Sequence, residues 1–219
     1  MTAGDLPALI RTELPLHAWR VIYLRYFCAA AVFMGTIILV QNMGATLNPV
    51  PVYGIAGLFV AVNLLYSLHL FQAARKTGMA SPDAAERSLM LQLAADLFLL
   101  TFLLHFSGGV SNPFMILYGL PILLSGFLLS GRATFLLAFL AAILYGGMAW
   151  LEYRRVIPHL PVPGLFSSTA YRNEPYLLVL LVAFGISIGL TAVLSSMLSG
   201  RLRLPVSEPV GGIDEELIR

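Results

Sequence analysis

Six apolar stretches, each about the length of a membrane-spanning helix, follow one another along this chain. Only 11% of the residues are charged, whereas 58% are hydrophobic. A soluble domain carries roughly 25% charged residues, so this chain lacks the side chains that cover a water-facing surface. We therefore predict an all-α, polytopic membrane protein with a bundle of six transmembrane helices, located as a multi-pass protein in the cell inner (plasma) membrane.

The domain division follows from the apolar stretches. A polar, proline-containing cytoplasmic tail is expected at 1–18, a membrane domain at 19–198, and a short cytoplasmic tail at 199–219. The predicted spans cover residues 20–41, 51–72, 88–106, 113–130, 132–151 and 176–198.

The basic residues set the expected orientation. With a cytoplasmic N-terminus, ten of the 13 Lys and Arg residues fall on the inner side, and only Arg154, Arg155 and Arg172 fall outside. Because cytoplasmic loops carry an excess of Lys and Arg, both termini are predicted to be cytoplasmic (N-in/C-in). The basic residues are spread over the ends of the spans, so we expect no nucleic-acid partner.

Two ionisable residues are predicted to lie inside the membrane. Asp96 is well inside the third span, and Arg25 is at a comparable depth in the first. Because such residues normally face the bundle interior and pair, we predict an Arg25–Asp96 ion pair. Alternatives are that Arg25 extends to the interface, and that Asp96 couples a proton or a signal or lines a solvated cavity. Asn63 and Gln92 are candidates for interhelical hydrogen bonds.

A short turn at 107–112 separates the third and fourth spans. Gly108 and Gly109 permit positive φ, and Asn112 followed by Pro113 is typical of a helix start. We expect amide N–H groups of this turn to be open toward a planar carbonyl ligand, with Phe114 available for stacking. The alternative is a helical hairpin turn with no further role.

The segment Gly108–Phe114 resembles the GG-x-x-NPF heptapeptide of RegB/PrrB-type redox sensor histidine kinases. In that family, the motif lies between the third and fourth helices of a six-helix membrane domain, and it is implicated in quinone binding. All five fixed positions match. Asp96, the segment 117–121 and Arg132 also fit the wider pattern.

The resemblance implies a quinone site, for ubiquinone or menaquinone, near the outer surface. The residues carried over by position are Gly108, Gly109, Asn112, Pro113 and Phe114. His105, one turn before the glycines, is a further candidate because an imidazole can hydrogen-bond a quinone carbonyl. The alternative for His105 is an incidental interfacial histidine.

The chain also departs from that family. Neither a phosphoacceptor histidine followed by an acidic residue nor an ATP-binding domain is found in this sequence. We therefore expect no enzymatic activity from this chain, whether it is a truncated, split or stand-alone sensor. Cys28 is the only cysteine, which excludes an internal disulfide and a Cys-rich metal site. No His or carboxylate pair has the spacing of a metal site.

Three further features allow two interpretations each. Glu152, Arg154, Arg155 and His159 are expected to form a solvated helix end with a salt bridge, or else a second ligand contact. Pro121 is expected to kink the fourth helix, as a functional or a tolerated feature. Two small residues four apart on the sixth span favour close packing within the chain, or else a homodimer contact; they are Gly185 and Gly189.

The leading functional hypothesis is a two-component signal transduction module. It would bind a hydrophobic small molecule, a quinone, between the third and fourth helices, and signal to a cytoplasmic kinase partner. The alternatives are a small membrane transporter component and a structural scaffold for a separately encoded kinase.

Overall fold

The computed structural model describes residues 23, 25–38, 40, 48–75, 82–165 and 169–202, with side chains for all of them except 69–75, 82–85 and 199–202. Within these residues the secondary structure is entirely helical, and six helical segments are present, which confirms the predicted all-α six-helix membrane fold. The predicted tail at 1–18 and most of the tail at 199–219 lie outside the described residues. The segments are a first helix Arg25–Ile37, α2 (Pro49–Arg75), α3 (Pro82–Phe106), α4 (Gly119–Leu128), α5 (Gly131–Tyr153) and α6 (Glu174–Leu202), with 3₁₀ turns η2 (Gly109–Ser111), η3 (Pro113–Tyr118) and η4 (Ala170–Arg172).

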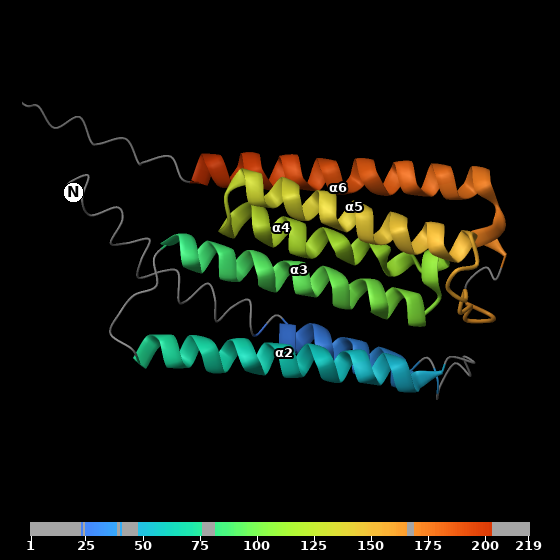
Figure 1. Cartoon of the computed structure of the whole chain (residues 1–219), viewed down its shortest axis with the longest axis horizontal. Coiled ribbons are helices and arrows are strands. Elements are labelled where there is room, and N and C mark those ends of the chain that lie inside the picture. Colours follow the sequence, from blue (N-terminus) through green and yellow to red (C-terminus); the bar gives the residue numbers. More distant parts are fainter. Residues whose placement is uncertain are drawn as a thin grey trace, which may run out of the picture.

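The helices lie side by side along one axis (Figure 1). α4, α5 and α6 pack against one another, and α3 lies between this group and the pair formed by α2 and the first helix. One end of the bundle carries η2, η4 and the connection from α5 to α6, and we call it the Glu152 end. The other carries the turn between α4 and α5, and we call it the Ser130 end.

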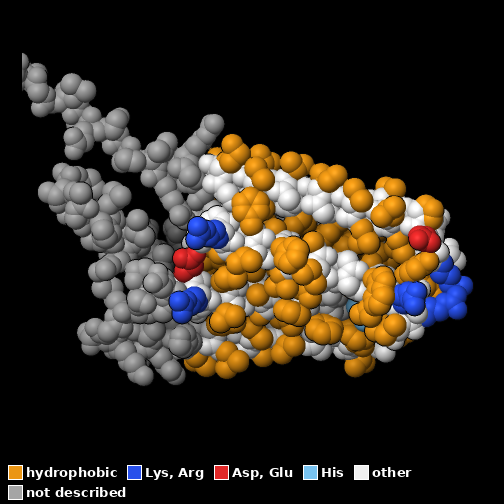
Figure 2. Space-filling model, turned by 45° about the horizontal axis from the view of Figure 1, so that its top comes forward, with side chains coloured by type: hydrophobic (Ala, Val, Ile, Leu, Met, Phe, Trp, Pro, Cys, Tyr) orange, Lys and Arg blue, Asp and Glu red, His pale blue; other side chains and the backbone are white. Residues whose placement is uncertain are grey.

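The surface between the two ends is apolar. Figure 2 shows hydrophobic side chains over the length of the bundle, whereas the charged side chains visible in that view gather at its two ends. Lipid-facing positions such as Ile116 and Val179 are 77% and 69% exposed. Four helices are long and apolar enough to cross a membrane, namely Pro49–Leu68, Glu86–Phe106, Gly131–Tyr153 and Glu174–Leu198. This surface has hydrocarbon as its natural solvent.

The fourth span is not one regular helix. It begins as the 3₁₀ segment η3 and becomes α-helical only at Gly119. Pro121 is the third residue of α4 and is buried. Pro121 therefore lies in the first turn of α4, where a helix tolerates a residue without an N–H, and the kink expected from it stays a prediction.

Three aromatic rings fill the core near the Glu152 end. Tyr118 and Tyr145 are fully buried, and Phe184 of α6 lies edge-on to Tyr118 with ring centroids 5.4 Å apart. The Tyr145 and Phe184 centroids are 4.4 Å apart. The Tyr118 hydroxyl is 2.6 Å from the hydroxyl of Thr101 on α3. This aromatic cluster joins four helical elements.

Small residues have different roles on α4 and α6. A Cβ on Gly126 of α4 would overlap Ser195 of α6, so these helices approach closely there. By contrast, a Cβ on Gly185 or Gly189 would meet no described atom within 4 Å. Among the described residues, no neighbouring element packs closely against this glycine pair, so close packing within the chain stays a prediction. The homodimer contact stays a prediction.

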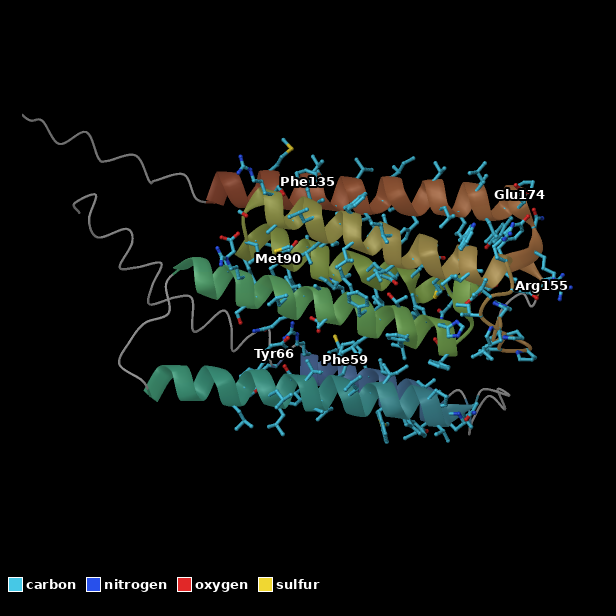
Figure 3. The ribbon with its side chains drawn as sticks, viewed as in Figure 1. Phe59, Tyr66, Met90, Phe135, Arg155 and Glu174 are labelled. Carbon is cyan, nitrogen blue, oxygen red and sulfur yellow. The ribbon has the colours of Figure 1, made fainter. Side chains whose placement is uncertain are left out.

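The predicted Arg25–Asp96 ion pair is present and joins the first helix to α3. The Arg25 guanidinium donates from Nε and Nη2 to Asp96 Oδ2 over 2.9 and 2.7 Å, and from Nη1 to Gln92 Oε1 over 3.0 Å. The guanidinium also lies 5.4 Å from the ring centroid of Tyr66 on α2, and Figure 3 shows Tyr66 on the side of α2 that faces α3. Arg25 thus connects three helices.

Removal of either partner should destabilise the bundle. We expect Arg25→Met or Asp96→Leu alone to lower the free energy of unfolding by on the order of 3 kcal/mol, because the remaining charge loses its partner inside the membrane. The double variant should lose less stability than the sum of the losses of the two single variants, since no uncompensated charge remains. Denaturant unfolding in detergent micelles measures all three, and strictly additive losses would contradict the coupling.

Candidate functional site

The turn between α3 and η3 adopts the backbone geometry that its sequence predicts. Gly108 has φ 123° and Gly109 has φ 58°, both in the region that side-chain-bearing residues avoid. Asn112 caps the following 3₁₀ segment, because its Oδ1 accepts a hydrogen bond from the Phe114 N–H over 2.9 Å. Pro113 occupies the first helical position. The two glycines and the cap therefore reverse the chain within a few residues.

The Asn112 side chain is used entirely by the turn itself. Its Nδ2 donates to the carbonyl and to the hydroxyl oxygen of Ser107, each over 2.8 Å. The Ser107 hydroxyl in turn donates to Leu103 O over 2.6 Å. Asn112 is 2% exposed. This residue has a structural role at the centre of the turn, with no amide group left for a ligand.

A buried carboxylate lies against the turn. Glu152, the penultimate residue of α5, has no exposed surface. Its Oε1 is 3.1 Å from His105 Nδ1, and its Oε2 is 2.7 Å from His159 Nδ1. Oε2 also accepts the Val110 N–H over 3.2 Å. We refer to Glu152, His105 and His159 as the carboxylate–imidazole cluster.

Glu152 gives a second reason for glycine at position 109 and corrects one of the sequence predictions. A Cβ on Gly109 would overlap its carboxylate, so glycine is required there for close approach as well as for φ. The Val110 N–H donates to Glu152 Oε2. The N–H groups of Ser111 and Asn112 donate to the carbonyls of Gly108 and Gly109, respectively. These amides are not open toward a ligand as predicted, because a carboxylate and the turn's own carbonyls accept their hydrogen bonds.

The predicted solvated helix end is only partly present. Arg154 and Arg155 are exposed, and Figure 3 shows Arg155 at the tip of the Glu152 end. Glu152, however, is buried, and the side chain of His159 is 2% exposed. The His159 ring stacks on Tyr171 of η4, with centroids 4.2 Å apart. The chain folds back over the end of α5 and removes these two groups from solvent.

The two imidazoles differ in their second nitrogen. His159 Nε2 is buried without a hydrogen-bond partner among the described residues. The side chain of His105 remains 14% exposed, and its only hydrogen bond within the described residues is made through Nδ1. No group of three metal-ligating side chains occurs among the described residues.

The predicted ligand residues separate into two sets. Gly108, Gly109 and Asn112 are buried within the turn, where they shape it. Pro113 and Phe114 are exposed at the start of η3, Phe114 by 53%. His105 links these sets because its imidazole reaches Glu152 on one side and the surface of the bundle on the other. Pro113, Phe114 and part of His105 are therefore the predicted ligand residues that reach the surface of the bundle.

The cluster is connected to the aromatic core. The Tyr145 hydroxyl donates to the Val110 carbonyl over 3.2 Å, and it lies 2.9 Å from the sulfur of Met115. Tyr145 also contacts Phe184 of α6. Val110 of the turn is therefore in direct contact with Tyr145, whose side chain packs on α6.

Sequence reasoning missed the importance of Glu152 and His159. The available signal was a single carboxylate at the end of an otherwise uncharged stretch, 134–151, with one histidine before it and one after it at the same end of the bundle. Such a residue normally lies in solvent. Only the fold-back of the segment between α5 and η4 encloses it.

The family model described as the PilS-like transmembrane domain, a six-helix unit, matches residues 15–206. No curated protein and no solved structure matches the chain. The family match supports the sensor-kinase type of membrane domain that the sequence predicts. It does not extend to the quinone motif of the RegB/PrrB-type sensors, which stays an expectation.

Substitution of Gly109 tests the contact with Glu152. Gly109→Ala should lower the free energy of unfolding by about 3 kcal/mol, because alanine is strained at positive φ and its Cβ displaces the buried carboxylate from its donors. Gly164→Ala is the matched control, since Gly164 has φ 83° but open space around it. The control should cost only about 1 kcal/mol. Equal losses in denaturant unfolding would contradict the proposed contact.

Proposed function

This chain belongs to the family of PilS-like transmembrane domains, and we propose from that premise that its Glu152 end is the sensing site of a two-component signalling system. The chain is a membrane signal-sensing module. The observation that carries the proposal is the fully buried carboxylate of Glu152, held by two imidazoles and by the amide of the glycine turn. A buried, hydrogen-bonded carboxylate of this kind is a candidate functional group by its chemistry.

The proposed ligand is the headgroup of a quinone, ubiquinone or menaquinone, at the lipid-facing edge of this end. His105 would hydrogen-bond one carbonyl oxygen through Nε2, and Phe114 would stack on the ring. Both side chains reach the surface of the bundle, because Phe114 is 53% exposed and the side chain of His105 is 14% exposed. An isoprenoid tail would then lie in lipid along α3 and η3, so only the polar headgroup would require a binding site in the protein.

The carboxylate–imidazole cluster offers a physical basis for distinguishing the two redox states. In a neutral imidazole one nitrogen donates and the other accepts. When His105 Nδ1 donates to Glu152, its Nε2 is an acceptor and suits the hydroxyl of a hydroquinone. When the imidazole is protonated, Nε2 donates and suits the carbonyl of a quinone. The role of His105 Nε2, as donor or as acceptor, would therefore differ between the two redox states of the ligand.

The proposed signal leaves the site through the aromatic core. Val110, Tyr145 and Phe184 form a continuous set of contacts from the turn to α6. With the N-in/C-in orientation, α6 runs from the outer surface to the cytoplasm, where a histidine kinase partner would receive the signal. The chain itself would act as sensor rather than enzyme, because none of its four histidines is followed by an acidic residue.

Ligand binding is tested by titrating the purified protein in detergent with short-chain ubiquinone and menaquinone analogues, using calorimetry. We expect saturable binding. Phe114→Ala should weaken it roughly tenfold through loss of the aromatic contact, whereas the control Ile116→Ala, in the same 3₁₀ segment, should leave the Kd unchanged.

His105→Gln adds a second readout. A glutamine amide can present either its donor or its acceptor by rotating, so this variant should bind the oxidised and reduced analogues with more similar affinities than the native chain does. If the native protein shows no saturable binding, or if Phe114→Ala binds as well as the native chain, the quinone proposal fails.

Orientation is tested with single cysteines. Cys28 is the only native cysteine, so Cys28→Ala gives a cysteine-free background. In intact cells, a membrane-impermeant thiol reagent should label Arg155→Cys at the Glu152 end, and it should label Arg132→Cys at the Ser130 end only after permeabilisation. The reverse pattern would place the proposed sensing site in the cytoplasm.

A further inference from the structure

A second polar site lies at the Ser130 end, far from the carboxylate–imidazole cluster. A cavity of about 270 Å³ opens there between the beginning of α3 and the beginning of α5. Figure 2 shows basic and acidic side chains together at the end of the bundle next to the grey segments. The residues that line the cavity are Glu86, Arg87, Met90, Ser130, Arg132, Ala133 and Leu136.

The cavity lies at the level of the lipid headgroups. Glu86 is the first residue of the span Glu86–Phe106, and Gly131 is the first residue of the span Gly131–Tyr153. The charged lining residues are therefore at the boundary between hydrocarbon and water, where phosphate groups of lipids are found. A volume close to the lower end for small-ligand cavities, about 300 Å³, suits a headgroup rather than a whole lipid.

The charge of the cavity favours an anion. Two guanidinium groups and one carboxylate line it, which leaves one positive charge. The Glu86 carboxylate accepts the Ser130 N–H over 3.1 Å at the start of α5. Among the described residues, neither Arg87 nor Arg132 forms an ion pair. Guanidinium groups bind phosphate oxygens through paired, charge-assisted hydrogen bonds.

The lining changes from charged to apolar in the direction of the membrane. Met90 follows Arg87 by three residues on α3, and Leu136 follows Arg132 by four residues on α5, so each lies one turn deeper on the same face as its arginine. Figure 3 shows Met90 on α3 toward this end of the bundle. Leu136 is 56% exposed, so the apolar side continues onto the lipid-facing surface. A ligand that fits this order has an anionic head and a hydrocarbon chain.

We propose that this cavity binds the phosphodiester headgroup of an anionic phospholipid, with Arg87 and Arg132 on the phosphate and the acyl chains along Met90 and Leu136. One lipid would bridge α3 and α5 at the end opposite the sensing site. The proposal is independent of the quinone proposal, because it uses no residue of the Glu152 end. With the N-in/C-in orientation, the site faces the inner leaflet, where basic pockets between transmembrane helices recognise anionic lipids.

The test is native mass spectrometry of the full chain in detergent micelles with added phosphatidylglycerol or phosphatidylcholine. We expect one phosphatidylglycerol molecule to bind in preference to phosphatidylcholine. Arg87→Gln combined with Arg132→Gln should weaken this binding roughly tenfold through loss of the charge-assisted hydrogen bonds. The matched control is Arg154→Gln with Arg155→Gln, which removes the same charge from the other end of α5 and should leave binding unchanged.

Two further arms distinguish the possible ligands. Arg132→Lys keeps the charge but loses the planar guanidinium group, so it should bind phosphatidylglycerol with intermediate affinity. This variant also tests the site if the double variant does not fold. Excess inorganic phosphate should not displace the lipid, because it lacks the acyl chains. Displacement by phosphate would indicate a free-phosphate site, and equal binding of the two lipids or an equal loss in the control would overturn the proposal.

Discussion

Polar groups within the hydrocarbon must find their hydrogen-bond partners inside the bundle, because lipid offers none. Two buried charged groups organise this protein, one inside the first helix and one at the end of α5. The Arg25 guanidinium is satisfied by Asp96 and Gln92 and joins the first helix to α3. The Glu152 carboxylate is satisfied from α3, from the glycine turn and from the segment after α5. Each interaction fixes the relative positions of elements that apolar packing alone would leave free to slide, since lipid tails are as apolar as the side chains between helices.

The Glu152 carboxylate also explains why the turn before η3 has its particular shape. A residue with a Cβ at position 109 would push the carboxylate away from the Val110 amide. The same turn is tied to the core through the Tyr145 hydroxyl. Val110 is hydrogen-bonded both to Glu152 and to Tyr145. The carboxylate–imidazole cluster is therefore close to the contact between Tyr145 and Phe184. This adjacency gives a sensing domain a short physical route from its surface to the helix that leaves the membrane.

The two ends of the bundle use charge differently. At the Glu152 end, one carboxylate is enclosed by imidazoles, and Arg154 and Arg155 are exposed. At the Ser130 end, Arg87 and Arg132 surround an open cavity. The enclosed carboxylate is held by its own hydrogen-bond donors, whereas open guanidinium groups can bind anions. The proposed redox ligand and the proposed lipid would therefore act at opposite membrane surfaces through different chemistry.

The sequence by itself determined the membrane class, the approximate position of each described span, the cap at Asn112 and the positive φ of Gly108 and Gly109. These features follow from local composition and from backbone sterics, which act within a few residues. The Arg25–Asp96 pair was also predictable, because burial of charge in lipid allows few alternatives. The tertiary structure alone decided that Glu152 is buried and that the amides of Val110, Ser111 and Asn112 are occupied. It also left Gly185 and Gly189 without close neighbours from other described elements. Each of these depends on which surface of one helix meets another, and in lipid hydrophobic patterning does not tell the inside of a bundle from the outside.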